Sequence, residues 1–470
     1  MTEEAASLGL VGYLAQTVGV TEPAFRLIVG VLLGYPLAQI YRKYIYNQDE
    51  QKQCLYFILS GLSIGFWNFG LGLLHCLLSI FVTYAAISCL SGLAMVSVVF
   101  GFNFAYLLVG YIYSSTDSYD ITWTMPYCVL VLRLIGVTYD VYDGARPKEK
   151  LSSDALKSAL KEPPTLLQIL GHSFFPSAFL VGPQFSMRRF LDFIKGDFHS
   201  KGPNGEILPP ASTSAALKRM TLGIFYMAFF QFLSFFVSDD TIISDDFAQL
   251  NIFKRQFLLG VWGRFTLYKY ISVWLLTEGA CILFGISYNG EENGVAKWNG
   301  VSNIKLWIFE SSTEFNHYIM SFNANTNQWV AQHIYKRLKF LNNKYISQGG
   351  VLLFLAVWHG LHSGYYVVFL HEFVVMYVER DFQSFVKSNK AVSAFFANPL
   401  VKPVCKVLLH MYTFVFMGWS LLPLVYLQFP RYWRAYSNCG YSGFILWYLW
   451  PLLYAPLLRK IFKKSHQSQS

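Results

Sequence analysis

Long apolar runs separated by short polar segments dominate the chain of 470 residues. An α-helix needs roughly 20 apolar residues to cross a hydrocarbon core of about 30 Å. Runs of that order occur at 24–45, 52–72, 73–89, 91–113, 121–142, 217–238, 256–287, 347–378, 404–428 and 440–458. Runs 52–72 and 73–89 form either a tight hairpin or one broken helix. The pattern therefore predicts an all-α polytopic transmembrane helical bundle of about 9–11 spans.

Two segments interrupt this pattern. Residues 143–216 begin with a polar stretch, and the apolar run that follows is broken by Pro176 and by Gly182-Pro183. Such a run is too irregular to cross and predicts a re-entrant or interfacial piece packed on protein. Residues 289–346 are aromatic-rich but are never apolar for 18 residues. Residues 7–20 predict a short interfacial helix.

Composition agrees with a membrane protein. Hydrophobic residues make up 54% of the chain and charged residues only 14%, against about 25% charged in soluble domains. The net charge is +10, but the cations gather where apolar runs end. Cytosolic loops carry such charge, so a nucleic-acid-binding role is not indicated. We find no internal repeat, which counts against transporters built from duplicated halves.

Span 256–287 contains three ionisable residues, Arg264, Lys269 and Glu278. A charge at membrane depth is costly unless it is paired or hydrated, so it indicates a functional or cavity-lining residue. The alternative is a residue near a span end whose side chain snorkels to the interface. Arg264 fits the alternative well, whereas Lys269 and Glu278 fit it less well.

The stretch LAVWHGLHSGYY, residues 355–366, places His359 and His362 inside a predicted span. Upstream, residues 325–341 show helical periodicity, and Asn342-Asn343 gives a turn signal. Ser347 is the predicted cap of the next helix. Residues 325–341 and 347–378 therefore predict an antiparallel helical hairpin.

Counting outward from Asn343 compares the two arms of this hairpin. Asn323 lies 20 residues before the turn and His359 lies 16 after it, a mismatch of about 6 Å at ~1.5 Å per residue. The count predicts that Asn323 faces His359, as an amide partner to an acid/base imidazole. The alternative is a hydrogen-bonded core histidine, although Gly360 leaves room for a ligand.

Other chemistry at this stretch is less well supported. His362 and Ser363 lie at i+3 and i+4 from His359, close to the same helical face. No HExxH motif or nearby carboxylate completes a metal site, so no metal is expected. Ser363 as a nucleophile is the rival to a histidine base. GxSxG, Walker A and GxGxxG motifs do not occur.

The pair SFNANTNQWV and LAVWHGLHSGYY resembles the signature of the membrane-bound O-acyltransferase family, with a histidine in a transmembrane helix and an asparagine upstream. FLVGPQFSMRRF, residues 179–190, resembles a segment of its lysophospholipid acyltransferase branch. The resemblance runs from about residue 125 to 380. It implies transfer of an acyl chain from acyl-CoA to the sn-2 hydroxyl of a lysophospholipid, with lysophosphatidylcholine favoured, in the endoplasmic reticulum membrane.

The resemblance also implies roles and leaves alternatives. His359 would take the proton of the acceptor hydroxyl, and Asn323 would orient a substrate or stabilise the oxyanion. No tightly bound cofactor is expected, and the partners are acyl-CoA, a lysophospholipid and the bilayer, with a homo-oligomer possible. Another lysophospholipid head, a sterol or a protein are the alternative acceptors. A proton-coupled transporter is the alternative from another class.

Acyl-CoA has a polyanionic head and an apolar tail, so its site needs cations and an apolar channel. Lys336, Arg337 and Lys339 are candidates for the phosphates, with Trp329 near the pantetheine or adenine; the alternative is an ordinary basic juxtamembrane face. Candidate lining and binding residues are Phe185, Trp307, Phe322, His362, Ser363, Tyr365 and Tyr366.

The predicted regions are 1–142, N-terminal transmembrane helices; 143–216, polar loop and re-entrant segment; 217–380, catalytic core with the Asn–His hairpin; and 381–470, C-terminal transmembrane helices and basic tail.

Overall fold

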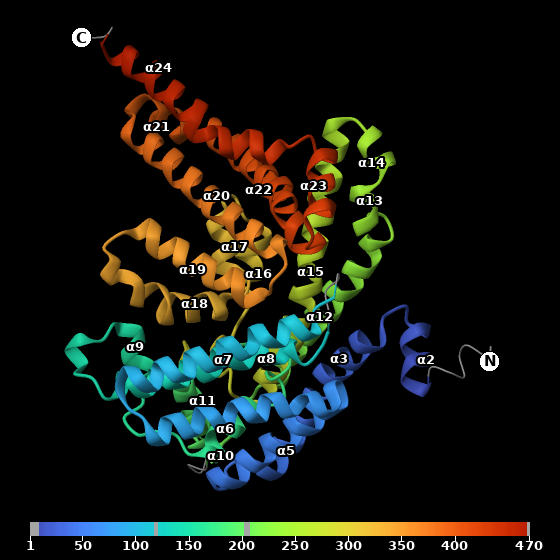
Figure 1. The fold of residues 1–470 in the computed structure, drawn as a ribbon, viewed down its shortest axis with the longest axis vertical. Coiled ribbons are helices and arrows are strands. Elements are labelled where there is room, and N and C mark those ends of the chain that lie inside the picture. The colour runs from blue at the N-terminus through green and yellow to red at the C-terminus, as the bar shows by residue number, and fades with distance from the viewer. Residues whose placement is uncertain (1–8, 117–120, 202–206, 468–470) are drawn as a thin grey trace. The chain divides into compact units, whose positions relative to one another are not determined.

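The computed structural model describes residues 9–116, 121–201 and 207–467. Helices dominate these residues (Figure 1), which confirms the all-α prediction. Two antiparallel hairpins of two-residue strands are the exceptions. Strand β1 (Ser200–Lys201) pairs with β2 (Ile207–Leu208), and β3 (Glu291–Glu292) pairs with β4 (Val295–Ala296).

The first half begins with a short helix inside the predicted segment 7–20, and Thr21 caps the helix after it by accepting the N–H of Ala24. In chain order they are α2 (Gly9–Thr17), α3 (Glu22–Leu32), α4 (Gly34–Ile40), the π-helical η1 (Tyr41–Ile45), α5 (Glu50–Phe69), η2 (Gly70–Gly72), α6 (Leu73–Cys89), α7 (Gly92–Ser114), α8 (Thr124–Gly144), η3 (Lys148–Lys150), α9 (Ser153–Ser158), α10 (Leu166–Ser173), α11 (Met187–Ile194) and α12 (Thr213–Ser234).

The second half is also helical. Its elements are α13 (Asp239–Ile243), α14 (Asp245–Gln249), α15 (Ile252–Phe284), α16 (Leu306–Glu310), α17 (Phe315–Ser321), α18 (Ala324–His333), the 3₁₀ helix η4 (Tyr335–Leu341), α19 (Lys344–His359), α20 (Ser363–Ser388), α21 (Lys390–Ala397), α22 (Val401–Tyr426), α23 (Phe429–Asn438), the π-helical η5 (Phe444–Tyr448) and η6 (Trp450–Tyr454), and α24 (Ala455–Gln467).

Seven helical stretches among the described residues are long and apolar enough to cross a membrane, so the protein is multi-pass. Stretch 50–89 counts once here, although a turn at Gly70 separates α5 from α6. The predicted spans 347–378 and 440–458 are each divided into shorter pieces. These three places account for the difference from the predicted 9–11. The seven stretches are 22–45, 50–89, 92–114, 124–144, 213–243, 252–284 and 401–426.

Contacts divide the chain into two compact units. The first unit contains residues 1–227, 270–304 and 323–337, and the second contains 228–269, 305–322 and 338–470. Asn323 belongs to the first unit and His359 to the second. Each unit is described below by itself.

The core of the first unit is built around the segment predicted to be re-entrant. Phe175 follows α10 and packs on Phe57 of α5, with ring centroids 4.8 Å apart. Gly61 of α5 allows this approach, since a Cβ there would lie 1.9 Å from the carbonyl oxygen of Phe174. Phe174 and Phe175 are fully buried. The prediction that this segment packs on protein is confirmed.

Arg133 of α8 holds the same segment in place. Its guanidinium donates to the carbonyls of His172, Ser173, Ala178 and Pro183 and to the side-chain oxygen of Gln184. These five bonds equal the five N–H groups of a guanidinium. A buried cation therefore satisfies carbonyl groups at the end of α10 and in the loop that follows it.

The second unit is organised around α20 and α22. His371 of α20 is buried, and its two ring nitrogens hydrogen-bond to the hydroxyls of Tyr448 (2.8 Å) and Tyr436 (2.6 Å). The ring of Trp419 from α22 lies 4.7 Å from the His371 ring. Both nitrogens of His371 are thus used in packing the unit.

The ionisable residues of span 256–287 differ from expectation. Arg264 is only 9% exposed, stacks over the ring of Phe309 and lies 3.8 Å from Glu310, so the prediction that it snorkels is wrong. Lys269 is exposed. Glu278 is 2% exposed, so its side chain does not snorkel; a functional or cavity-lining role for it stays a prediction.

Candidate active site

His359 is the last residue of α19, because the chain leaves the helical conformation at Gly360. Gly360 has φ +148°, and a Cβ there would lie 2.7 Å from Cε2 of Tyr365. His362 then stands at the N-cap of α20. Figure 1 shows α19 and α20 as separate helices. The single helix predicted for 347–378 is therefore wrong, and so is the shared helical face of His359, His362 and Ser363.

The His359 ring is oriented by its own helix and by neighbouring rings. Nδ1 lies 2.8 Å from the carbonyl oxygen of Leu355, one turn earlier. A carbonyl only accepts, so Nδ1 carries the hydrogen and Nε2 of the neutral imidazole has the lone pair. Centroids of Trp358 and Phe369 lie 4.6 and 5.1 Å from the half-buried imidazole. The arrangement presents one basic nitrogen in a fixed direction.

The Ser363 hydroxyl is used in a loop contact. It donates to the carbonyl of Leu427 (3.3 Å) and accepts from the hydroxyl of Tyr432 (3.3 Å). The N–H of Gly364 donates to the same carbonyl at 2.8 Å. The hydroxyl proton therefore points to a carbonyl rather than to a base. This geometry fits a structural role better than a nucleophile.

Asn323 precedes α18 in a left-handed conformation, with φ +50° and ψ +42°. Its carbonyl accepts the N–H of Asn327 (3.1 Å), while its half-buried side chain does not cap the helix. Asparagine tolerates this conformation better than most residues. The amide side chain is thereby kept out of helix capping.

The predicted arm 325–341 is only partly α-helical. Helix α18 ends at His333 and continues as the 3₁₀ helix η4, which rises about 2.0 Å per residue instead of 1.5 Å. The rise count that aligned the two arms is therefore wrong for this arm. Asn343, and not Ser347, caps α19, because its side chain accepts the N–H groups of Tyr345 and Ile346.

Two of the three candidate phosphate-binding cations are ion-paired within the first unit. Arg337 lies 2.6 Å from Asp143 of α8, whose side chain is 1% exposed. Lys336 pairs with Asp154 of α9 and holds the pKa of that carboxyl below its usual value. Lys339, in the second unit, is exposed.

The aromatic candidates lie in different surroundings. In the first unit, Trp329 packs against Gly136 of α8, and Phe185 is buried beside His172. In the second unit, Tyr365 is buried against His359. The remaining three are Phe322, stacked on Phe309 at 6.0 Å, and Tyr366 and Trp307, which are 36% and 84% exposed.

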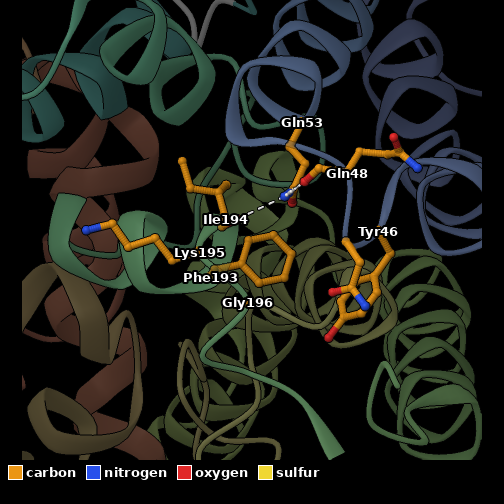
Figure 2. Close-up of a pocket in the computed structure, with 8 residues that line it drawn as sticks. Tyr46, Gln48, Gln53, Phe193, Ile194, Lys195 and Gly196 are labelled. Atoms are coloured by element: carbon orange, nitrogen blue, oxygen red, sulfur yellow. Dashed lines mark hydrogen bonds between the residues drawn. The ribbon is translucent and has the colours of Figure 1, made fainter. Parts of the chain in front are cut away.

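A pocket of about 330 Å³ in the first unit has none of these candidates in its lining. Its lining comes from the η1–α5 connection and the end of α11. Figure 2 shows the bond from the Gln53 side chain to the carbonyl of Ile194, 2.9 Å long, with Lys195 directed away from it. Among the described residues, no group of three or more His, Cys, Asp or Glu side chains is placed to hold a metal ion.

Comparison with known proteins identifies the family of the chain. The sequence model of the membrane-bound O-acyltransferase family matches residues 108–422, a range that includes Asn323 and His359. The chain belongs to the membrane-bound O-acyltransferase family. This confirms the family inferred from the sequence motifs, and with it the acyltransferase class of enzyme.

Several proteins named lysophospholipid acyltransferase are similar to the chain over most of its length. Lysophospholipid acyltransferase 5 of Drosophila melanogaster is 42% identical over 455 residues, which cover 95% of this chain and 90% of that protein. The protein of the same name from Homo sapiens is 41% identical over 453 residues, covering 95% and 91%. Lysophospholipid acyltransferase of Schizosaccharomyces pombe is 28% identical over 372 residues, covering 76% and 72%.

Proposed function

We propose that this membrane-bound O-acyltransferase transfers the acyl chain of acyl-CoA to the free sn-2 hydroxyl of a lysophospholipid, with lysophosphatidylcholine the preferred acceptor, in the endoplasmic reticulum membrane. Two things support a lysophospholipid as the acceptor: the names of similar relatives and the GPQFSM segment of the chain. The observation that carries the mechanism is the hydrogen bond between Nδ1 of His359 and the carbonyl of Leu355.

His359 acts as the general base. An alcohol must lose its proton as its oxygen attacks the thioester carbon, and a positioned neutral imidazole accepts that proton at Nε2. A new C–O ester bond forms and the C–S bond breaks. The proton then passes from Nε2 to the departing CoA thiolate, which leaves as the thiol. A covalent acyl-enzyme is not needed, since the thioester is already activated.

Asn323 supplies an amide to the reaction, in the catalytic core predicted for residues 217–380. Its side chain either orients a substrate or donates a hydrogen bond to the oxyanion that forms at the thioester carbonyl. Of the three candidate cations, Lys336 and Lys339 suit the CoA phosphates best. The partner of Lys336 is an exposed carboxylate that phosphate can replace, whereas Arg337 is committed to the buried Asp143.

The test is turnover of the purified protein with radiolabelled acyl-CoA and lysophosphatidylcholine. His359→Ala is expected to lower kcat by about 10²–10⁴-fold, because it removes the general base. His410→Ala is the control, because His410 of α22 contacts the carbonyl oxygen of Ser312 and is not a candidate site residue, and it is expected to keep wild-type kcat. Wild-type kcat in a folded His359→Ala variant would falsify the catalytic assignment.

Acceptor selectivity is tested in the same assay. Lysophospholipids with other heads, a sterol and a peptide are each supplied in place of lysophosphatidylcholine. We expect the highest kcat/KM with lysophosphatidylcholine. A higher kcat/KM with another head would correct the acceptor while leaving the reaction class intact.

A further inference from the structure

Glu278 of α15 is a buried carboxylate with no place in the proposed chemistry. One of its oxygens accepts the N–H groups of Asn303 and Ile304, at 2.6 and 2.9 Å. The other lies 3.3 Å from Nε of Arg219 of α12. All four residues belong to the first unit. A buried carboxylate that is both paired and hydrogen-bonded fixes the backbone to which it binds.

Asn303, the residue held by Glu278, in turn holds the chain just after Asn323. Its carbonyl accepts the N–H of Ala324 at 2.9 Å, and its side-chain oxygen accepts the N–H of Asn325 at 3.1 Å. The Asn325 side chain returns a bond to the carbonyl of Val301 at 2.9 Å. Two successive backbone N–H groups after Asn323 are thereby tied to one residue.

These bonds have a specific consequence for Asn323. Its left-handed backbone is sparsely populated in free chains and persists when the surrounding structure determines it. Among the described hydrogen bonds, those of Asn303 reach the backbone on the C-terminal side of Asn323 and not the Asn323 side chain. The direction of the Asn323 amide therefore depends on Asn303, and the place of Asn303 depends on Glu278.

We propose that Glu278 and Asn303 are positioning residues that set the direction of the Asn323 amide and thereby kcat. This inference rests on the proposed role of Asn323. Neither residue is assigned contact with substrate, so their removal changes kcat and leaves substrate binding intact.

The first measurement separates kcat from KM. Asn303→Ala removes the oxygen that accepts from Asn325 and is expected to lower kcat by about tenfold or more, with KM for both substrates nearly unchanged. Asn303→Asp keeps an acceptor oxygen at that position and is expected to recover most of the loss. Glu278→Gln keeps one acceptor but loses the charge that faces Arg219, so an intermediate loss is expected.

A matched control removes another ion pair that involves the same helix. Arg264 of α15 pairs with Glu310, which contacts neither Asn303 nor residues 323–325 in the described hydrogen bonds. Glu310→Gln is expected to keep wild-type kcat. An equal fall of kcat in Glu310→Gln and Glu278→Gln would show a general effect of ion-pair loss and overturn the proposal.

The decisive measurement is the effect of Asn303→Ala in an Asn323→Ala background. If Asn303 acts through the Asn323 amide, the second substitution lowers the residual kcat by less than about twofold, because contacting residues are non-additive. Equal fold losses in both backgrounds would overturn the positioning role. Wild-type kcat in Asn323→Ala alone would overturn the role of Asn323 itself and this inference with it. A low kcat in Asn323→Ala with wild-type kcat in Asn303→Ala would overturn only the inference.

Hydrogen exchange provides a readout independent of activity and applies even to a variant with reduced yield. The amide of Asn325 is expected to exchange faster in Asn303→Ala than in the wild-type protein, because its acceptor is the Asn303 side chain, while the amides of α20 keep their wild-type rates. Unchanged exchange at the Asn325 amide would contradict the proposed support of this backbone by the Asn303 side chain.

Discussion

The two side chains assigned to the reaction are held by opposite means. His359 is oriented by residues close to it in sequence: its own helix supplies the carbonyl of Leu355, and Trp358 and Phe369 contact the ring. The backbone beside Asn323 is tied to Asn303 and, through it, to Glu278 and Arg219. The local support of His359 needs only a helix end, whereas the support of Asn323 by residues distant in sequence needs the fold of a whole unit. Perturbations of the fold should therefore reach Asn323 more readily than His359.

Separating backbone from side chain at Asn323 has the largest expected effect. Asn323→Gly adopts the left-handed conformation without strain but has no amide. We expect a fall in kcat of about 10²–10³-fold, the usual loss for one oxyanion-hole donor. Asn323→Gly is assayed beside Asn323→Ala. Near wild-type kcat in the glycine variant alone would mean that the backbone conformation, and not the amide, is what the site needs.

The second largest effect is expected from breaking the buried ion pair that follows α18 in the unit that supports Asn323. Arg337→Ala leaves the buried carboxylate of Asp143 with only the longer contact to Arg146, at 3.9 Å. Loss of one partner of a buried pair costs about 3–5 kcal/mol, and we expect about 3 because the Arg337 side chain is 23% exposed. The measurement is the thermal midpoint of the purified protein. A double variant that also carries Asp143→Asn should recover stability, and failure to do so would argue against this pair as the cause.

Gly360→Ala tests the local support of His359 by the end of α19. The left-handed φ and the contact with Tyr365 are expected to cost about 2 kcal/mol of unfolding free energy and to lower kcat by turning His359. Gly349→Ala in the same helix is the control, because a Cβ at Gly349 meets nothing within 4 Å. That variant should gain up to about 1 kcal/mol. Equal stabilities of the two variants would contradict the helix end described at Gly360.

The smallest effect is expected from Lys336→Ala. Its partner Asp154 is an exposed carboxylate, so the pair contributes less than about 1 kcal/mol. The lowered pKa of Asp154 in the folded protein makes this contribution complete above about pH 4 and lost as the pH falls through the folded pKa. Thermal midpoints of both proteins at neutral pH and below pH 4 check the sign. A loss of stability as large as that of Arg337→Ala would contradict the contrast between the exposed pair of Lys336 and the buried pair of Arg337.

Periodic features were predictable from the sequence, and the supports of the site were not. Apolar runs of membrane length and the Pro/Gly-broken segment beside α8 were predicted, because each is a local property of composition. The break at Gly360 has a sequence signal in glycine itself, but the close approach of Tyr365, which leaves no space for a Cβ there, has none. Asn303 was missed, because a hydrogen bond across 22 residues has no periodicity.

The end of α19 at His359 also has an electrostatic consequence. Peptide dipoles sum along a helix to about half a negative charge at its C-terminus, which favours a cation there. In the proposed mechanism Nε2 takes the proton of the acceptor hydroxyl, and the imidazolium formed in this way stands at the negative pole of a helix of 16 residues. The end of the helix at Gly360 thus also provides a local electric field that favours the charge created in the proposed mechanism.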